Sequence, residues 1–350
     1  MNKHHIKYGK KSMHIKSFKK IFITENDALK AEDRKVNDYY VKQTDRLRCK
    51  NCYNSIGEID FKKQDISYSI CKKCGHLNGL FEDTTEFCKF AYQGSGRQNF
   101  LANYSSQGKK DYDLRVKNIY VPKVEFLIES LQKDGIDETK LSFSDIGSGL
   151  GYFVSALLSQ GQKKVSGYEV SKENVTLSNS FIGKNLVNYH EIDETIHTVK
   201  SIKSNVVTMI GVLEHLQDPN SLLDELCKNS NVQYIFIAVP IFSLSVFFEM
   251  LSPKTFHRQL SNDHTHLYTD QSIKWLCDKF NLLRVSEWWF GQDILDLYRH
   301  TLVNASKECK LSNFAADEFN KIFTPLIDAL QLSIDKEKYS SEVHILLKKS

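Results

Sequence analysis

Proline is scarce in this chain, and neither sign of charge dominates it. Five prolines and 16 glycines among 350 residues exclude a collagen-like or low-complexity protein. Hydrophobic residues make up 41% and charged residues 26% of the sequence, which excludes wholesale disorder. The 47 basic and 43 acidic side chains leave a net charge of +4, so the composition does not require a nucleic-acid partner. The length favours two domains, or one large domain with an appendage.

Long apolar runs are also missing. The most apolar stretch, 234–251, is interrupted by Pro240 and Glu249, whereas a membrane span needs about 20 predominantly apolar residues. We therefore predict a buried strand that ends at Pro240, then an apolar helix, and no membrane span. Residues 1–20 hold seven lysines and no apolar core, so they do not resemble a signal peptide, and we expect a cytoplasmic protein. We interpret them as a solvated basic tail, with an RNA- or membrane-binding arm as the alternative.

Eight cysteines are present, and four of them form two C-x-x-C pairs. Between the pairs lie 18 residues, and the four cysteines are Cys49, Cys52, Cys71 and Cys74. Each pair directs two thiolates to one point, and two pairs complete a tetrahedron around Zn²⁺. Disulfides would need an oxidising compartment, and a redox pair would lie near a βαβ unit. We predict a structural zinc ribbon, because four thiolates leave the ion no open position for catalysis.

From residue 141 onward, strand-like and helix-like segments alternate. Such alternation predicts a parallel, doubly wound sheet, and the strands are expected at 141–146, 164–169, 186–190, 206–210 and 234–239. A helix with one apolar face is expected to precede them, starting at Pro122. We divide the chain into a basic tail (1–40), a zinc ribbon (41–90), an aromatic connector or lid (91–120) and one large α/β domain (121–350).

A glycine-rich turn follows the first of these strands. It reads DIGSGLG and contains Asp145, Gly147, Gly149 and Gly151. The dinucleotide fingerprint G-x-G-x-x-G would need a glycine at position 152, where Tyr152 stands. The spacing G-x-G-x-G, with an acid two residues before it, instead resembles the first motif of class I S-adenosylmethionine (SAM)-dependent methyltransferases. The resemblance implies that this turn binds SAM.

Three later segments carry the same resemblance. The second predicted strand ends at Glu169, where an acid can bind ribose hydroxyls. In the family an acid after the third strand often faces the adenine, and Asp193 occupies that region. The segment 211–219, GVLEHLQDP, resembles the family's fourth-strand segment, which implies that Gly211 and Glu214 border the cofactor.

The end of the chain completes the expected fold. Residues 281–288 read as a sixth strand, and residues 342–347 as a final apolar strand after a helical stretch around 314–332. Class I methyltransferases close their sheet with an antiparallel seventh strand. We therefore predict an α/β fold with a doubly wound, seven-stranded, Rossmann-like sheet and a small N-terminal zinc ribbon.

The absence of two motifs narrows the range of possible methyl acceptors. Amino-methylating DNA and RNA enzymes typically carry Asp/Asn-Pro-Pro-Tyr/Phe after the fourth strand, and cytosine-C5 enzymes need Pro-Cys; neither is present. The segment 263–272, DHTHLYTDQS, resembles in placement the Glu-His-x-x-Tyr/Phe-x-Ser segment of zinc-containing sugar methyltransferases. This resemblance implies that His264 is the catalytic base and that Asp263 supports it. His215 and His266 are further candidates for the base.

These features predict a SAM-dependent methyltransferase. The expected acceptor is a sugar, a nucleotide sugar or a similar small polar metabolite, methylated on oxygen or carbon in polysaccharide or glycosylated-metabolite biosynthesis. One alternative is an RNA methyltransferase whose zinc ribbon binds RNA, and its binding would weaken steeply with salt. Another is a non-catalytic binding module that keeps the fold. The sequence leaves the identity of the acceptor and the oligomeric state open.

Overall fold

A computed structural model describes residues 4–11, 21–92, 108–260 and 264–350. Within these ranges the larger sheet has eight strands, in the order β1-β11-β12-β9-β8-β5-β6-β7. The bounds of these strands are β1 His5–Tyr8, β5 Phe143–Ile146, β6 Val165–Glu169, β7 Val187–Tyr189, β8 Val206–Ile210, β9 Tyr234–Pro240, β11 Leu282–Phe290 and β12 Glu342–Lys349.

The middle of this sheet is parallel, as predicted. Strand β5 pairs with β6 and β8, β6 with β7, and β8 with β9, all in parallel. Strand β12 lies antiparallel between β9 and β11 and closes the sheet, as the sequence predicts. Strand β9 ends at Pro240. It is buried along its whole length, because both of its faces are covered. The α/β, Rossmann-like fold is confirmed.

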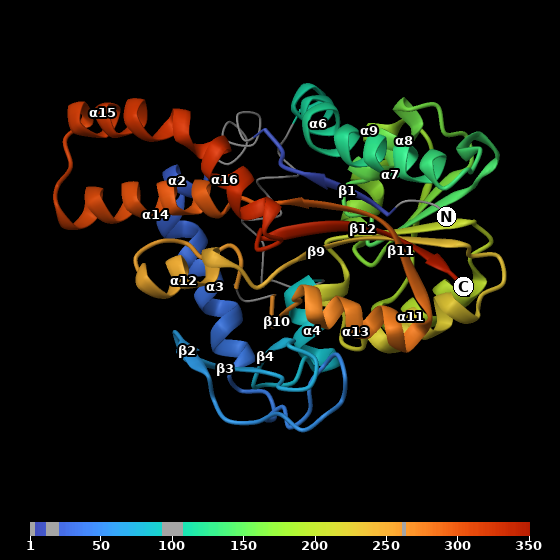
Figure 1. Cartoon of the computed structure of the whole chain (residues 1–350), viewed down its shortest axis with the longest axis horizontal. Coiled ribbons are helices and arrows are strands. Elements are labelled where there is room, and N and C mark those ends of the chain that lie inside the picture. Colours follow the sequence, from blue (N-terminus) through green and yellow to red (C-terminus); the bar gives the residue numbers. More distant parts are fainter. Residues whose placement is uncertain (1–3, 12–20, 93–107, 261–263) are drawn as a thin grey trace.

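Helices cover both faces of the sheet (Figure 1). One apolar core lies under η2, α6, α7, α8 and α9, with bounds Val116–Tyr120, Lys109–Arg115, Val121–Lys133, Tyr152–Ser159 and Lys172–Ile182. The other core lies under α10, α11 and α13, with bounds Thr195–Ser201, Pro219–Lys228 and Asp270–Phe280. Short helical turns η3 (Glu138–Lys140), η4 (Ile192–Glu194) and η5 (Leu213–His215) lie in the connections.

The eighth strand comes from the segment interpreted as a solvated tail. Strand β1 pairs in parallel with β11, and His5 lies opposite Ser286. The Nζ of Lys7 lies 4.2 Å from the ring centroid of Trp288, so part of the basic character is used in cation–π contact with the sheet. The expectation of a solvated tail is therefore wrong for residues 5–8. Their sequence does not indicate a strand, because the partner strand lies far along the chain.

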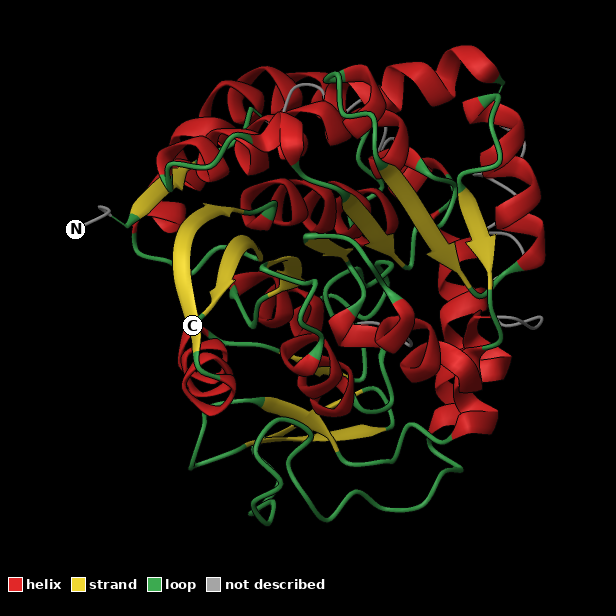
Figure 2. Ribbon diagram, turned by 90° about the vertical axis from the view of Figure 1, so that its right-hand side faces the viewer, coloured by secondary structure: helices red, strands yellow, loops and turns green. Residues whose placement is uncertain are grey.

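A second, smaller sheet belongs to the cysteine-rich segment. Within the described ranges it has the order β10-β4-β3-β2, with bounds β2 Phe61–Lys63, β3 Ile66–Ile70, β4 Leu77–Gly79 and β10 His266–Leu267. The helices α3 (Asn26–Tyr40) and α4 (Thr85–Tyr92) pack on it, after the single turn α2 (Ile21–Thr24). Figure 2 shows this sheet apart from the larger one, at the lower edge of the molecule. Its fourth strand, β10, comes from the large domain, which the sequence does not indicate.

The C-terminal helices extend away from the sheet on one side (Figure 1). Their bounds are α12 Leu244–Leu251, α14 Asp293–Glu308, α15 Asn313–Phe323, η6 Thr324–Leu326 and α16 Ile327–Lys336. None of the helices in the described ranges combines the length and the apolar character needed to cross a bilayer.

Candidate active site

The glycine-rich turn has the backbone that its sequence requires. Gly147, Gly149 and Gly151 adopt φ values of 66°, 53° and 71°, in the left-handed region that favours glycine. A Cβ on Gly147 would also lie 2.7 Å from Cγ2 of Val212. The turn therefore brings backbone to the end of β5 where a side chain would not fit, and α8 begins directly after it.

Glu169 contacts this turn from the end of β6. One carboxylate oxygen accepts from the backbone N–H of Gly149 at 2.8 Å, and the other accepts from that of Ser171 at 2.9 Å. The side chain is buried, and it borders a cavity of about 270 Å³. We call this cavity, which Gly147, Glu169, Gly211 and His215 help to line, the Glu169 cavity.

Asp145 lies at the end of β5 and is fully buried. Its carboxylate accepts a hydrogen bond from the Thr208 hydroxyl at 2.6 Å. Burial raises the pKa of this carboxyl to about 7, although hydrogen bonds from Thr208 and Ser148 oppose the rise. Asp145 borders a cavity of about 180 Å³ that also contacts Gly147, Gly149 and Tyr120, which we call the glycine-loop cavity.

A third cavity of about 230 Å³ completes the site. We call it the Arg258 cavity, and its polar lining includes Lys123, Glu214, Arg258, Gln259, His264 and Glu342. It shares Gly211 with the Glu169 cavity and Tyr120 with the glycine-loop cavity. Gly147 in turn lines both of the other cavities. The three spaces therefore adjoin one another at the carboxyl ends of β5 and β8, the usual place for ligands in such sheets.

Glu214, His215 and His264 converge where these cavities meet. Their ligand-type atoms all lie within 4.8 Å of one another, and the two imidazole rings have centroids 4.9 Å apart. His264 Nδ1 lies 2.8 Å from the carbonyl oxygen of Gln259, so it donates and the lone pair falls on Nε2. The structure thus brings two of the predicted catalytic histidines together with Glu214.

The other predicted site residues lie elsewhere. His266 is fully buried, with Nδ1 2.8 Å from Nε2 of His76, and burial holds its pKa well below the usual value. Asp193 is 58% exposed and forms an ion pair of 2.8 Å with Lys89 of α4. It lines a neighbouring cavity of about 360 Å³, which shares Ile192, Thr195, His215 and Leu216 with the Glu169 cavity. Asp263 lies outside the described residues.

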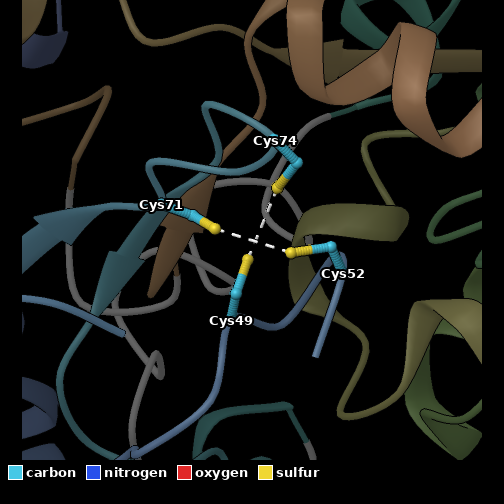
Figure 3. Close-up of side chains that lie close together, drawn as sticks. All are labelled: Cys49, Cys52, Cys71 and Cys74. Carbon is cyan, nitrogen blue, oxygen red and sulfur yellow. Dashed lines mark hydrogen bonds between the residues drawn. The ribbon is translucent and has the colours of Figure 1, made fainter. Parts of the chain in front are cut away.

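The four predicted zinc ligands form one cluster. Their sulfur atoms point toward a common centre in Figure 3 and all lie within 4.8 Å of one another. Cys49 and Cys74 have sulfurs 3.6 Å apart, and Cys52 and Cys71 have sulfurs 3.5 Å apart. Thiolates at 2.3 Å from one ion in a tetrahedron lie about 3.8 Å apart, so the cluster has the size of a zinc site.

The ribbon directly contacts the loop that carries His264. The backbone N–H of Gly79, on β4, donates to the Thr265 carbonyl at 2.7 Å, and β4 then pairs with β10. Asn78, which precedes Gly79 on β4, donates to Cys49 Sγ and accepts from the Lys50 N–H at 2.9 Å. Strand β4 therefore links the cysteine cluster, through Asn78, to Thr265, the residue next to His264.

Comparison with known proteins places the chain in a family. Residues 113–287, half of the chain, match the methyltransferase domain family. The chain belongs to this family. In this methyltransferase the matched segment begins in α6 and ends in β11, so it includes the glycine-rich turn, Glu169, Glu214, His215 and His264.

Individual relatives are distant. The ubiquinone biosynthesis O-methyltransferase of Rickettsia canadensis (strain McKiel) is 26% identical over 122 residues, which cover 34% of this chain and 51% of the relative. The chain thus spans about half the length of the curated relative it matches.

Among solved structures, magnesium protoporphyrin IX methyltransferase from Synechocystis PCC 6803, with bound SAH, has a TM-score of 0.46 at 11% identity, covering 76% of this chain and 99% of that one. A SAM-dependent methyltransferase from Archaeoglobus fulgidus has a TM-score of 0.38 at 15% identity, covering 76% and 100%.

Several residues of the site escaped the sequence analysis. Gln259 orients His264 through a backbone carbonyl, which any residue type provides. Tyr92 has its hydroxyl 3.2 Å from His215 Nδ1, and Arg258 reaches its cavity from a loop after α12. Gln259 and Arg258 lie on a connection and Tyr92 ends α4, and none of the three belongs to a motif, so only the fold could reveal their place in the site.

Proposed function

We propose that this methyltransferase transfers a methyl group from SAM to a small polar acceptor. The observation that carries the proposal is the contact between its cavities. The Glu169 and glycine-loop cavities share Gly147 of the family's glycine-rich turn, and both adjoin the Arg258 cavity. A donor and an acceptor bound in adjoining cavities can be held in line for displacement, which supplies much of the rate of such a reaction.

The cofactor residues have separable roles in this proposal. The glycine-rich turn allows SAM to approach the backbone, and Glu169 binds the ribose hydroxyls in place of its present N–H partners. The Asp145 carboxyl borders the glycine-loop cavity, and the cationic groups of a bound SAM would favour its ionised form. Asp193 is proposed to lie near the adenine of the bound cofactor. Its ion pair with Lys89 would hold it there.

The Arg258 cavity is proposed to hold the acceptor. Its volume of about 230 Å³ is below the range of about 300–1,000 Å³ found for drug-sized ligands, which favours a small molecule. Its lining carries charged groups, the Gln259 amide and the Ser341 hydroxyl, which suits a molecule rich in hydroxyl groups. A free sugar, or the sugar part of a nucleotide sugar, fits this description. The name of the Rickettsia relative, an O-methyltransferase, favours oxygen as the methylated atom.

An oxygen acceptor must lose its proton as the methyl group arrives. In the metal-free protein we propose that Nε2 of His264 receives this proton, since Nδ1 already donates to the Gln259 carbonyl. His215, with its ring beside His264, is the second candidate for the base, and Asp263 remains a proposed support for His264. His266 is the least suited of the three histidines, because it is fully buried against His76.

The zinc ribbon is proposed to shape the acceptor side of the site. Cys49, Cys52, Cys71 and Cys74 would hold a structural Zn²⁺, and the bound ion would fix the two knuckles relative to each other. Strand β4, which leaves the second knuckle, would then hold β10 and Thr265 in place. In this proposal zinc acts on catalysis only through the position of the loop that carries His264.

The proposal is tested by methyl transfer from radiolabelled SAM to a panel of acceptors. The panel contains nucleotide sugars, free sugars, small hydroxy acids, phenols and total RNA. We expect label in a hydroxylated small molecule and a SAM dissociation constant measurable by calorimetry. Label in RNA alone would contradict the acceptor class, and absence of SAM binding would contradict the function itself.

A further inference from the structure

A second metal-type cluster lies beside the Arg258 cavity, separate from the four cysteines. Glu214 and His215 come from η5, directly after β8, and His264 comes from the loop before β10. One atom from each of the three side chains lies within 4.8 Å of the others, and Glu214 Oε1 lies 3.9 Å from His215 Nε2. Two imidazole nitrogens and one carboxylate oxygen therefore lie within 4.8 Å of one another.

Both histidines of this cluster are oriented through Nδ1. His264 Nδ1 lies 2.8 Å from the Gln259 carbonyl oxygen, and His215 Nδ1 lies 3.2 Å from the Tyr92 hydroxyl. Histidines that bind metals typically donate their second ring N–H to such an oxygen, which fixes the ring and makes the other nitrogen a better ligand. The pattern thus orients the Nε2 atoms as the coordinating atoms.

We propose that Glu214, His215 and His264 bind a divalent transition-metal cation. Ligand atoms at about 2.0–2.2 Å from one ion lie roughly 3.0–3.5 Å apart, so side-chain shifts of less than 1 Å would complete the site. Imidazole nitrogens favour transition-metal ions such as Fe²⁺, Co²⁺ or Zn²⁺ over Ca²⁺ and Mg²⁺, and the Glu214 carboxylate also suits Mn²⁺. Three protein ligands leave coordination positions for an acceptor in the Arg258 cavity, which Glu214 and His264 both line.

The cation would deepen the proposed methyl transfer, on which this part of the inference rests. An acceptor hydroxyl bound to the ion releases its proton to solvent more readily, because coordination lowers its pKa. The oxygen then attacks the methyl carbon of SAM. The carbon–sulfur bond breaks as the carbon–oxygen bond forms, and the electron pair of the broken carbon–sulfur bond stays on sulfur. With the ion bound, His264 acts as a ligand and no longer takes the proton.

The open coordination positions also favour one class of acceptor. A cation with three protein ligands can bind two further oxygens that lie side by side. An acceptor with two neighbouring oxygens, such as a vicinal diol, would therefore be held by both and presented to SAM by one.

Binding of Mn²⁺ to the full chain tests the metal site without any acceptor. Electron paramagnetic resonance reports free Mn²⁺, and this ion prefers nitrogen and oxygen ligands over the thiolates of the ribbon. We expect one equivalent to bind, and Glu214→Gln and His264→Gln each to weaken binding at least about tenfold. The matched control is His197→Ala, a substitution of an exposed histidine on α10, which should leave binding unchanged.

Two results would overturn this inference. One is the absence of saturable Mn²⁺ binding, and the other is equal affinity in the wild type and in both folded cluster variants. His264 is only half-buried, so His264→Gln keeps the test available if Glu214→Gln does not fold. Calorimetric SAM binding by the same samples separates this failure from failure of the proposed function, because SAM does not need the cation to bind.

Discussion

Residues on the proposed cofactor side of the site lie close together in the chain, whereas those on the proposed acceptor side come from distant segments. Gly147, Gly149 and Glu169 fall within two consecutive strand–helix units, and Glu169 accepts a hydrogen bond from the Gly149 N–H. The acceptor side combines Gly79 of the ribbon with Glu214, Gln259 and His264 of the large domain. The cofactor side should therefore withstand damage to the ribbon, and the acceptor side should not.

Loss of one of the four clustered cysteines, the proposed zinc ligands, should separate the two sides most strongly. We expect Cys74→Ser to reduce methyl transfer at least about 100-fold, because an incomplete thiolate set no longer holds the knuckles and a misplaced base is costly. The SAM dissociation constant should stay within about threefold of the wild type. Methyl transfer is measured with the acceptor found in the panel, and SAM affinity is measured by calorimetry. Cys309→Ser, at an exposed cysteine, is the control and should change neither.

Damage to the cofactor side should give the opposite pattern. Glu169→Ala removes the carboxylate proposed to bind the ribose, so SAM affinity should fall about 10- to 100-fold, as expected for lost charge-assisted hydrogen bonds. Hydrogen exchange of residues 264–268 should stay as in the wild type. A variant with normal SAM affinity would remove Glu169 from the cofactor site.

A smaller change tests the contact between the ribbon and the loop. A Cβ on Gly79 would lie 2.7 Å from the Thr265 carbonyl oxygen and 2.8 Å from the Tyr40 hydroxyl. Gly79→Ala should therefore displace Thr265 and lower methyl transfer about 10-fold or more, while zinc content and SAM affinity are retained. Gly57→Ala, in the same ribbon with open space around its Cβ, is the matched control. Equal activity of both variants would show that the contact does not position the loop.

The last prediction concerns stability instead of activity, through a pH dependence at Asp145. Its pKa is raised from 3.8 to about 7 in the fold, so the native state holds a proton that the unfolded state has lost between these values. The free energy of unfolding contributed by this group should therefore decrease as pH rises from about 4 to about 7. Asp145→Asn should remove this part of the slope, measured by denaturant unfolding at pH 5 and pH 7. An unchanged slope would place the titration on another group.

Local patterns explain why the cofactor side could be predicted. The glycines at 147, 149 and 151 have the positive φ angles that their spacing suggests, and β8 has the predicted bounds 206–210. Ser171 caps the helix that follows β6, a role that serine commonly takes. Such features depend on a few consecutive residues, and the sequence contains them directly.

Long-range pairing explains why other features could not be predicted. Strand β1 reads as a lysine-rich tail until β11, far along the chain, is placed beside it. Strand β10 has two residues, too few for any period, and exists because β4 of the ribbon pairs with it. Gln259 and Tyr92 contribute through single contacts with the histidines. These relations depend on the packing of two sheets, which no local pattern specifies.

Hydrogen–deuterium exchange before and after zinc removal tests the central claim most directly. The claim is that the ribbon holds the loop of His264 while the cofactor side stands by itself. Removal of zinc with a chelator should speed exchange in peptides that cover residues 264–268 and leave peptides that cover residues 145–152 unchanged. Equal acceleration in both regions, or none in residues 264–268, would contradict the account.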